Sequence, residues 1–168
     1  MAAKKEKTLT DLFENGLKDV YYAEKKILAA LPKMAKATET EELAAAFEKH
    51  RTETEQQVER LEEVFDVLNQ QPKGKKCPGI DGILEEGKEI LEEFKGMPAL
   101  DAGLLAAAQA VEHYEITRYG TLIAWAEKLG LRDAVPLLQE TLEEEKNTDR
   151  ALTKLAETAV NQYAQAAE

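Results

Sequence analysis

Apolar residues recur at steps of three and four along four long segments of this chain, and this period restricts the fold to packed helices. The segment over residues 9–36 has its apolar side chains at Leu9, Leu12, Phe13, Leu17, Val20, Ile27, Leu28, Leu31 and Met34. Residues 41–70, 99–129 and 133–163 continue in the same way. Each apolar stripe needs another helix to cover it. The sequence therefore predicts an all-α protein.

The breaks between these segments predict how the helices connect. Thr8 and Asp11 can cap the first helix, residues 38–40 form a turn to the second, and Gly130 ends the third in the usual C-cap manner. Residues 71–82 and 96–98 are rich in Pro and Gly and enclose a short helix over residues 83–94. Two hairpins joined by one long crossover give a ferritin-like four-helix bundle, with residues 1–168 as a single domain.

Composition excludes several classes of protein. A net charge of −11 disfavours nucleic acid and anionic membranes as partners. The Lys-rich stretch from Met1 to Lys7 is not followed by an apolar run of signal-peptide or membrane-spanning length. Cys77 is the single cysteine, so no internal disulfide can form, and the expected compartment is a reducing cytoplasm. With no second cysteine to resolve an oxidised thiol, Cys77 is read as a bystander rather than a redox residue.

Ionisable side chains fall on the apolar faces of all four long helices. Core positions seldom carry a charge, so these residues are the candidates for function. They are Glu24 in residues 9–36, His50 and Glu53 in residues 41–70, Glu112 and Glu115 in residues 99–129, and Glu145 and Asp149 in residues 133–163. Glu53 lies at the edge of its stripe. No Lys or Arg lies at the centre of these stripes, and in the run Glu143 to Glu145 only Glu145 is expected to point inward.

The seven candidates also lie at similar heights along the helices. Each is about 20–28 Å from its hairpin turn at a rise of about 1.5 Å per residue, so all can share one layer. Burying several unpaired carboxylates is untenable without positive charge to compensate them. Iron, manganese and zinc suit carboxylate and imidazole ligands. The sequence predicts a site for two divalent metal ions, about 3.5–4 Å apart, with iron as the leading candidate.

Several stretches resemble the YciF/YciE-like bacterial stress proteins. They are residues 11–26, 50–54 with 59–61, 111–116 with 119–120, and 140–149, and the resemblance extends over nearly the whole chain. That group belongs to the ferritin-like superfamily, which implies the same fold and a carboxylate-bridged di-iron pattern. The pattern carries over to Glu24, Glu112, Glu115 and Glu145. The chain departs from it where His50 precedes Glu53 and where Asp149 stands in place of a histidine, which leaves the identity of the metal open.

Three functions remain open at this point. The leading hypothesis is a di-metal stress protein that uses iron or manganese and takes O₂ or peroxide as its small oxidant. The second is a non-catalytic interaction or scaffold protein with a vestigial or structural metal site. The third is mineral storage in a ferritin-like cage, although a homodimer is the expected assembly because helix hairpins often associate side by side. Tyr119 is either an ordinary core residue or a partner of a ligand carboxylate.

Overall fold

The computed structural model describes residues 6–167. Residues 1–5, which include most of the Lys-rich stretch, lie outside the described residues. Helices account for the regular structure of the described part, which contains no strand, and this confirms the all-α prediction. The helices are α1 (Leu9–Ala37), α2 (Glu41–Val67), α3 (Pro78–Glu93), α4 (Leu100–Leu129) and α5 (Ala134–Leu155), followed by a π-helical turn (Ala156–Val160) and α6 (Asn161–Gln165).

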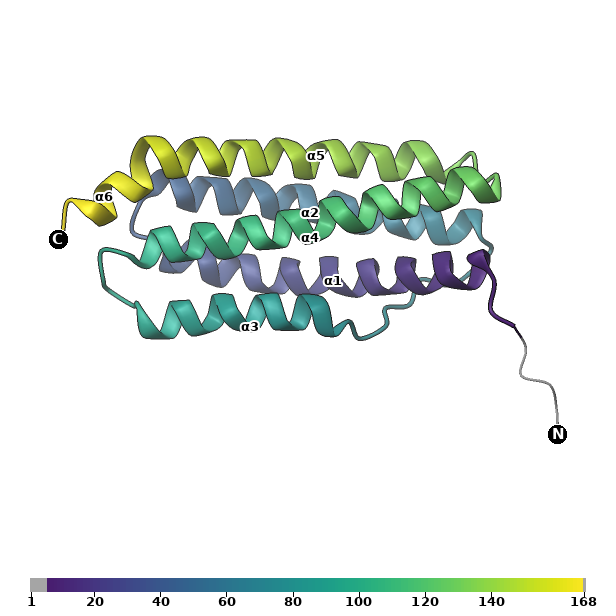
Figure 1. Cartoon of the computed structure of the whole chain (residues 1–168), viewed down its shortest axis with the longest axis horizontal. Helices are drawn as coiled ribbons and strands as arrows, with labels where there is room; N and C mark the ends of the chain where they lie inside the picture. Colours follow the sequence, from purple (N-terminus) through teal and green to yellow (C-terminus); the bar gives the residue numbers. More distant parts are fainter. Residues whose placement is uncertain (1–5, 168) are drawn as a thin grey trace.

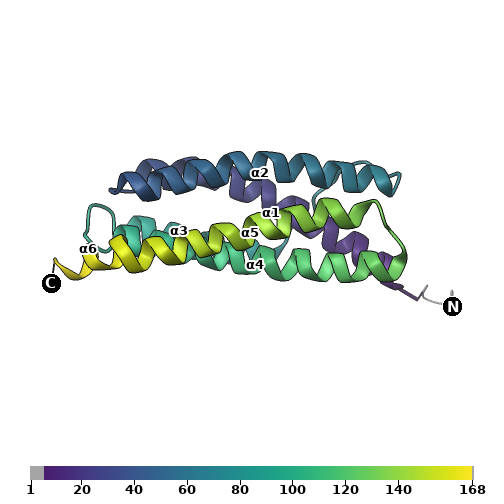
Figure 2. The same cartoon turned by 90° about the horizontal axis from the view of Figure 1, so that it is seen from above.

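The four longest helices run side by side along the long axis of the molecule (Figures 1 and 2). Helix α1 packs against α2 and α4, and α5 packs against α4 and α2. The shorter α3 lies against α1 and α4 on the outside of this group. No helix of the described residues is long and apolar enough to cross a membrane.

The helix boundaries follow from local chemistry. Thr8 and Asp11 form the predicted capping box at the start of α1. Helix α2 ends at Val67, earlier than expected, and Asn69 just beyond it takes a left-handed backbone with φ 54°. Helix α3 begins at Pro78 rather than at residue 83. A proline has no N–H to offer and a φ suited to the first helical turn, so Pro78 starts this helix instead of breaking the chain.

An aspartate from α4 fixes the turn between α1 and α2. The Asp101 carboxylate is 3% exposed and accepts hydrogen bonds from the backbone N–H of Glu39, at 3.0 and 3.2 Å, and of Thr40, at 2.8 Å. These donors lie just before the first turn of α2, where backbone N–H groups have no partner within the helix. Asp101 therefore caps α2 from another helix and holds the first hairpin against the second.

The apolar core has two parts with a polar layer between them. One part lies toward the α1–α2 turn and includes Ile27, Leu31, Phe47 and Leu104. The other lies toward the α4–α5 turn and includes Phe13, Leu17, Phe65, Tyr119 and Leu138. Glu24, His50, Glu112, Glu115 and Glu145 fall where their helices pass from one part to the other. The fold thus surrounds a set of carboxylates with apolar side chains above and below.

Candidate metal centre

Each of the four long helices contributes to the buried polar layer. Glu24 comes from α1, His50 from α2, Glu112 and Glu115 from α4, and Glu145 from α5. Their exposed fractions lie between 0 and 3%. Glu112 and Glu115 are three residues apart, so both point to the same face of α4. The sequence correctly placed all five side chains in the interior.

Four of these residues bring their donor atoms into one small volume. His50 Nδ1 lies 3.1 Å from Glu112 Oε1, and His50 Nε2 lies 3.9 Å from Glu145 Oε2. One donor atom from each of His50, Glu112, Glu115 and Glu145 can be chosen so that all lie within 4.8 Å of one another. Glu24 lies in the same layer, where the Tyr119 hydroxyl donates a short hydrogen bond to its Oε1 atom. Of the two roles predicted for Tyr119, this contact supports that of a hydrogen-bond partner for a carboxylate.

Most oxygens of this layer have no hydrogen-bond partner outside the layer. Buried polar atoms are nearly always hydrogen-bonded, so every exception requires a physical reason. Within the described residues the atoms without a partner outside the layer include Glu24 Oε2, His50 Nε2, and both carboxylate oxygens of Glu112, Glu115 and Glu145. Inside the layer these groups contact one another, Glu24 with Glu115 and Glu112 with both Glu145 and His50. Eight such atoms in one layer form a ready set of donors for a cation.

Burial also controls the protonation of the layer. Desolvation raises the pKa of Glu24 to about 7, although its bond from Tyr119 opposes the shift. Desolvation raises the pKa of Glu112 to about 8. The pKa values of Glu115 and Glu145 also lie well above the usual range, because both are desolvated and both face neighbouring carboxylates. Without a cation, the layer therefore retains protons at neutral pH.

The pKa of His50 is shifted in the direction that suits a metal ligand. Desolvation, together with the charge of Lys49, lowers the pKa of His50 to about 4, so its imidazole is neutral at physiological pH. Only a neutral imidazole has a lone pair to give to a metal. Oxygen donors with one imidazole nitrogen match iron, manganese and zinc. This buried cluster of His and Glu residues is able to hold a metal ion.

Two predicted ligands lie outside the cluster. The Glu53 carboxylate pairs with Lys49 and accepts a bond of 3.5 Å from the Thr148 hydroxyl. Asp149 Oδ1 accepts a bond of 3.1 Å from the Gln109 side chain and lies 3.2 Å from His113 Nε2. Both carboxylates are 21% exposed. They lie near the edge of the layer, as expected for Glu53, and neither lies among the close donor atoms.

A buried arginine was missed. Arg60 of α2 is 9% exposed, and its guanidinium donates to Glu144 at 2.7 and 2.5 Å and to the Thr141 hydroxyl at 3.0 Å. Glu144 also accepts a bond of 3.0 Å from the Gln57 side chain, so it is not the solvated residue expected from the acidic run. The signal was present in the sequence, because Gln57, Arg60 and Val64 follow the helical step of three and four.

Comparison with known proteins gives matches over nearly the whole chain. Residues 8–165 match the family model described as a domain of unknown function, DUF892. Protein YciF of Escherichia coli K12 is 48% identical over 160 residues, which cover 95% of this chain and 96% of that protein.

Solved structures agree with the sequence match. The crystal structure of the E. coli stress protein YciF gives a TM-score of 0.88 at 48% identity, covering 93% of this chain and 99% of that one. YcfI of Rhodopseudomonas palustris, whose description suggests a structural role, gives 0.86 at 46% identity, with coverages of 91% and 98%. A protein of Xanthomonas campestris pv. campestris at 22% identity shares the fold, with a TM-score of 0.73 and coverages of 94% and 96%.

Proposed function

This chain belongs to the DUF892 family, with the YciF stress protein among its relatives, and we propose that it is a ferritin-like four-helix stress protein built around two divalent metal ions. The observation that carries the proposal is the layer of buried carboxylates that, apart from the bond from Tyr119 to Glu24, receive no hydrogen bond from outside the layer. The proposed ligands are Glu24, His50, Glu112, Glu115 and Glu145. A cytoplasmic location and a homodimer remain predictions.

Charge balance favours two ions over one. Glu24, Glu112, Glu115 and Glu145 together carry four negative charges when ionised, and two divalent cations neutralise four. A single divalent ion would require two of the carboxyls to keep their protons, whereas two ions balance the fully ionised layer. His50 is neutral and adds no charge to this count. Arg60 is already paired with Glu144 and is not available to compensate the layer.

The surrounding residues prepare the centre for redox chemistry. Glu24, His50, Glu112, Glu115 and Glu145 would hold the two ions, and iron in this place would supply the two electrons that, with two protons, reduce a peroxide to two waters. Tyr119 fixes the orientation of Glu24, and such partners of a ligand keep it in place. Apolar side chains on both sides exclude bulk water from the layer. Iron or manganese therefore suits this proposal better than zinc, which has no redox chemistry.

An interaction or scaffold function is the alternative. The structural role suggested for YcfI favours it, as does the acidic surface implied by a net charge of −11. In this second case the carboxylate layer would hold a metal for stability or none at all. Metal content separates the two cases.

The test compares two neighbouring glutamates of α5. Glu145→Leu removes a carboxylate that is 0% exposed, whereas Glu143→Leu changes one that is 61% exposed and bonded only to Lys146. Protein purified without chelator is loaded with Fe²⁺ under anaerobic conditions and with Mn²⁺, desalted, and analysed for metals. We expect about two ions per chain in the wild type and in Glu143→Leu, and a clear loss in Glu145→Leu. Equal metal content in all three proteins would remove Glu145 from the site and favour the scaffold function.

A further inference from the structure

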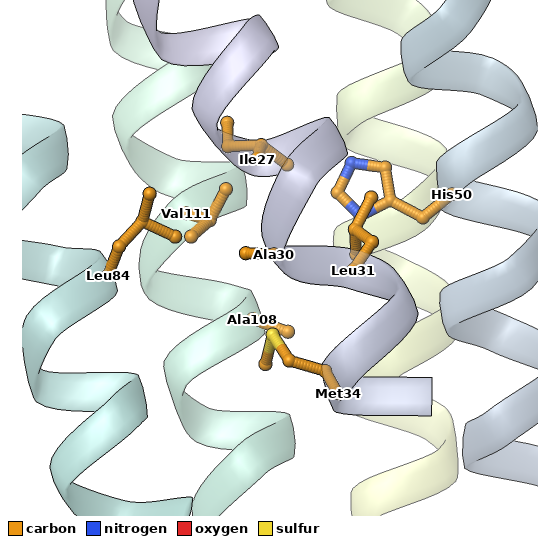
Figure 3. A pocket seen from close by; sticks show the side chains of 8 residues that line it. All are labelled: Ile27, Ala30, Leu31, Met34, His50, Leu84, Ala108 and Val111. Atoms are coloured by element: carbon orange, nitrogen blue, oxygen red, sulfur yellow. The ribbon is translucent and has the colours of Figure 1, made fainter. Parts of the chain in front are cut away.

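A small apolar cavity reaches the metal centre from the side of α1, α3 and α4 (Figure 3). Its volume is about 10 Å³, and it is lined by Ile27, Ala30, Leu31, Met34, His50, Leu84, Ala108 and Val111. His50 is the only polar side chain among these eight and lies beside Ile27 and Leu31 in Figure 3. The cavity therefore ends at a residue of the buried cluster.

The outer side of the cavity continues into a groove on the surface. This groove has a volume of about 650 Å³ and shares Ala30, Met34, Leu84 and Val111 with the cavity. Exposed lysines of α1 and α3, such as Lys33 and Lys88, lie along its rim. The cavity next to His50 therefore adjoins the surface groove, and Ala30, Met34 and Leu84 are among the residues that separate the two.

The lining decides which molecules can use this path. A buried water needs two to four polar partners, and a hydrated ion needs still more, but the cavity offers only the imidazole of His50. A small uncharged apolar molecule loses little by leaving water and needs no such partner. The present volume is about the least that holds one water molecule, so dioxygen would enter only when the walls move apart. Met34 and Leu84 are partly exposed, so rotamer changes can widen the entrance on the ps–ns timescale.

We propose that this cavity is the binding and entry site for a small apolar gas, with dioxygen as its probe, and that Ala30, Met34 and Leu84 control access to the metal centre. The use of this site in catalysis rests on the proposed function, but the binding of gas does not. A polar oxidant such as peroxide, and the metal ions themselves, would need a different route.

The first experiment detects the gas in the metal-free protein. Dissolved dioxygen is paramagnetic and relaxes nearby methyl protons, so NMR compares the protein under O₂ and under N₂. We expect the methyl groups of Ala108 and Val111 to relax several-fold more than those of Val64 and Leu138 in the other part of the core. They should also relax more than those of Ile123 in that part, which at 8% is slightly more exposed than either. Ala30→Leu fills the entrance and should reduce the effect to the level of Val64 and Leu138. Ala29→Leu is the control, because Ala29 lines the groove but not the cavity.

The second experiment uses the Fe²⁺-loaded protein. Ala30→Leu should slow oxidation by O₂ about tenfold, which corresponds to a barrier raised by about 1.4 kcal/mol, and should leave oxidation by peroxide and iron content unchanged. Leu84→Ala should keep or increase the rate with O₂.

Two results would overturn the proposal. The first is that the methyl groups of Ala108 and Val111 relax no more under O₂ than the other core methyl groups. Equal O₂ rates in wild type and Ala30→Leu would also overturn it, even if iron binds. Gas binding in a protein that takes up neither iron nor manganese would support the cavity and refute the proposed metal function.

Discussion

At the scale of single residues, Tyr119 is the contact that holds Glu24 in place. Its hydroxyl is fully buried and donates to Glu24, and this bond lowers the pKa of Glu24 against the larger effect of desolvation. In Tyr119→Phe the carboxylate loses its partner and becomes harder to ionise. We expect a 10–100-fold loss of metal affinity, roughly the effect of removing the partner of a ligand.

The matched control for this prediction is Tyr21→Phe. Tyr21 is also a tyrosine with a bonded glutamate, donating to Glu62 at 2.7 Å, but this pair lies away from the buried cluster. Isothermal titration with Mn²⁺ would compare the two variants with the wild type. Equal affinities in Tyr119→Phe and Tyr21→Phe would show that Glu24 does not need its tyrosine.

The raised pKa values predict how the metal-free protein responds to pH. The pKa of Glu24 is about 7 and that of Glu112 about 8 in the folded protein, against 4.5 for an unperturbed glutamate. The folded state then binds more protons than the unfolded state, so stability falls as pH rises. His50, with its pKa lowered to about 4 from 6.5, acts in the opposite direction, but only below pH 6.5. Between pH 6.5 and 8 the carboxylates alone should set the slope.

Urea unfolding of chelator-treated protein would measure this slope. We expect the free energy of unfolding to fall by up to about 1.4 kcal/mol per pH unit for each carboxyl that remains protonated in the folded state. Glu112→Gln should reduce the slope, because it removes the group with a pKa of about 8. A free energy that rises over this range would contradict the assignment of protonated buried carboxyls.

At the scale of helices, Asp101 joins the two hairpins. Its carboxylate accepts three backbone N–H contacts of 2.8–3.2 Å at the start of α2, although it belongs to α4. Asp101→Ala would leave these backbone donors without their protein partner and remove a negative charge from a helix N-terminus. We expect a loss of about 2 kcal/mol in the free energy of unfolding. Asp66→Ala, an exposed change within α2, should alter it by less than about 0.5 kcal/mol. Chemical denaturation of both variants provides the comparison.

The sequence predicted those parts of the helices that local chemistry determines. The start of α1 followed from Thr8 and Asp11, and the inward direction of Glu24 and Glu145 followed from helical periodicity. The start of α3 was wrong, because Pro78 both ends a loop and begins a helix, and the sequence does not distinguish these roles. The capping of α2 by Asp101 depends on contacts between distant segments, so no local pattern could reveal it.

The site was predicted less completely than the fold. Periodicity predicts on which face of a helix a residue lies, but it does not predict how far or in which direction its side chain extends. Glu53 and Asp149 have the right height, yet their carboxylates turn toward Lys49, Gln109 and His113 at the edge of the layer. Arg60 was missed for a related reason, because its long side chain buries its stem while its guanidinium reaches Glu144.

At the scale of the whole molecule, the first prediction concerns assembly. A dimer of this 18.7 kDa chain is expected, and light scattering after size-exclusion chromatography would measure its mass. A particle of many subunits would instead favour storage of mineral in a cage. A monomer would contradict both and leave the metal proposal unaffected, because every proposed ligand comes from one chain.

The stability of the whole molecule also depends on whether metal occupies its centre. Ions that bind only the folded state stabilise it by mass action, by about 2.7 kcal/mol at a free concentration 100 times the Kd. For a chain of this length that corresponds to a rise in Tm of about 5–10 °C. Calorimetry at neutral pH over a series of Mn²⁺ or anaerobic Fe²⁺ concentrations would measure the rise, which should persist in Glu143→Leu.

Glu145→Leu should separate two contributions of the buried layer to this stability, the burial of a carboxyl and the binding of metal. Without metal, it replaces a desolvated carboxyl by an apolar side chain of similar size, so the variant should be as stable as the wild type or more stable by about 1–4 kcal/mol. With metal, it lacks a ligand, so its Tm should no longer rise along the titration. The plots of Tm against metal concentration for the two proteins should therefore cross. The variant should have the higher Tm in chelator and the lower Tm in excess metal. A Tm that rises equally in both proteins would place the ions elsewhere on the chain, whereas a Tm that rises in neither would mean that the buried carboxylates remain stable through their protons alone.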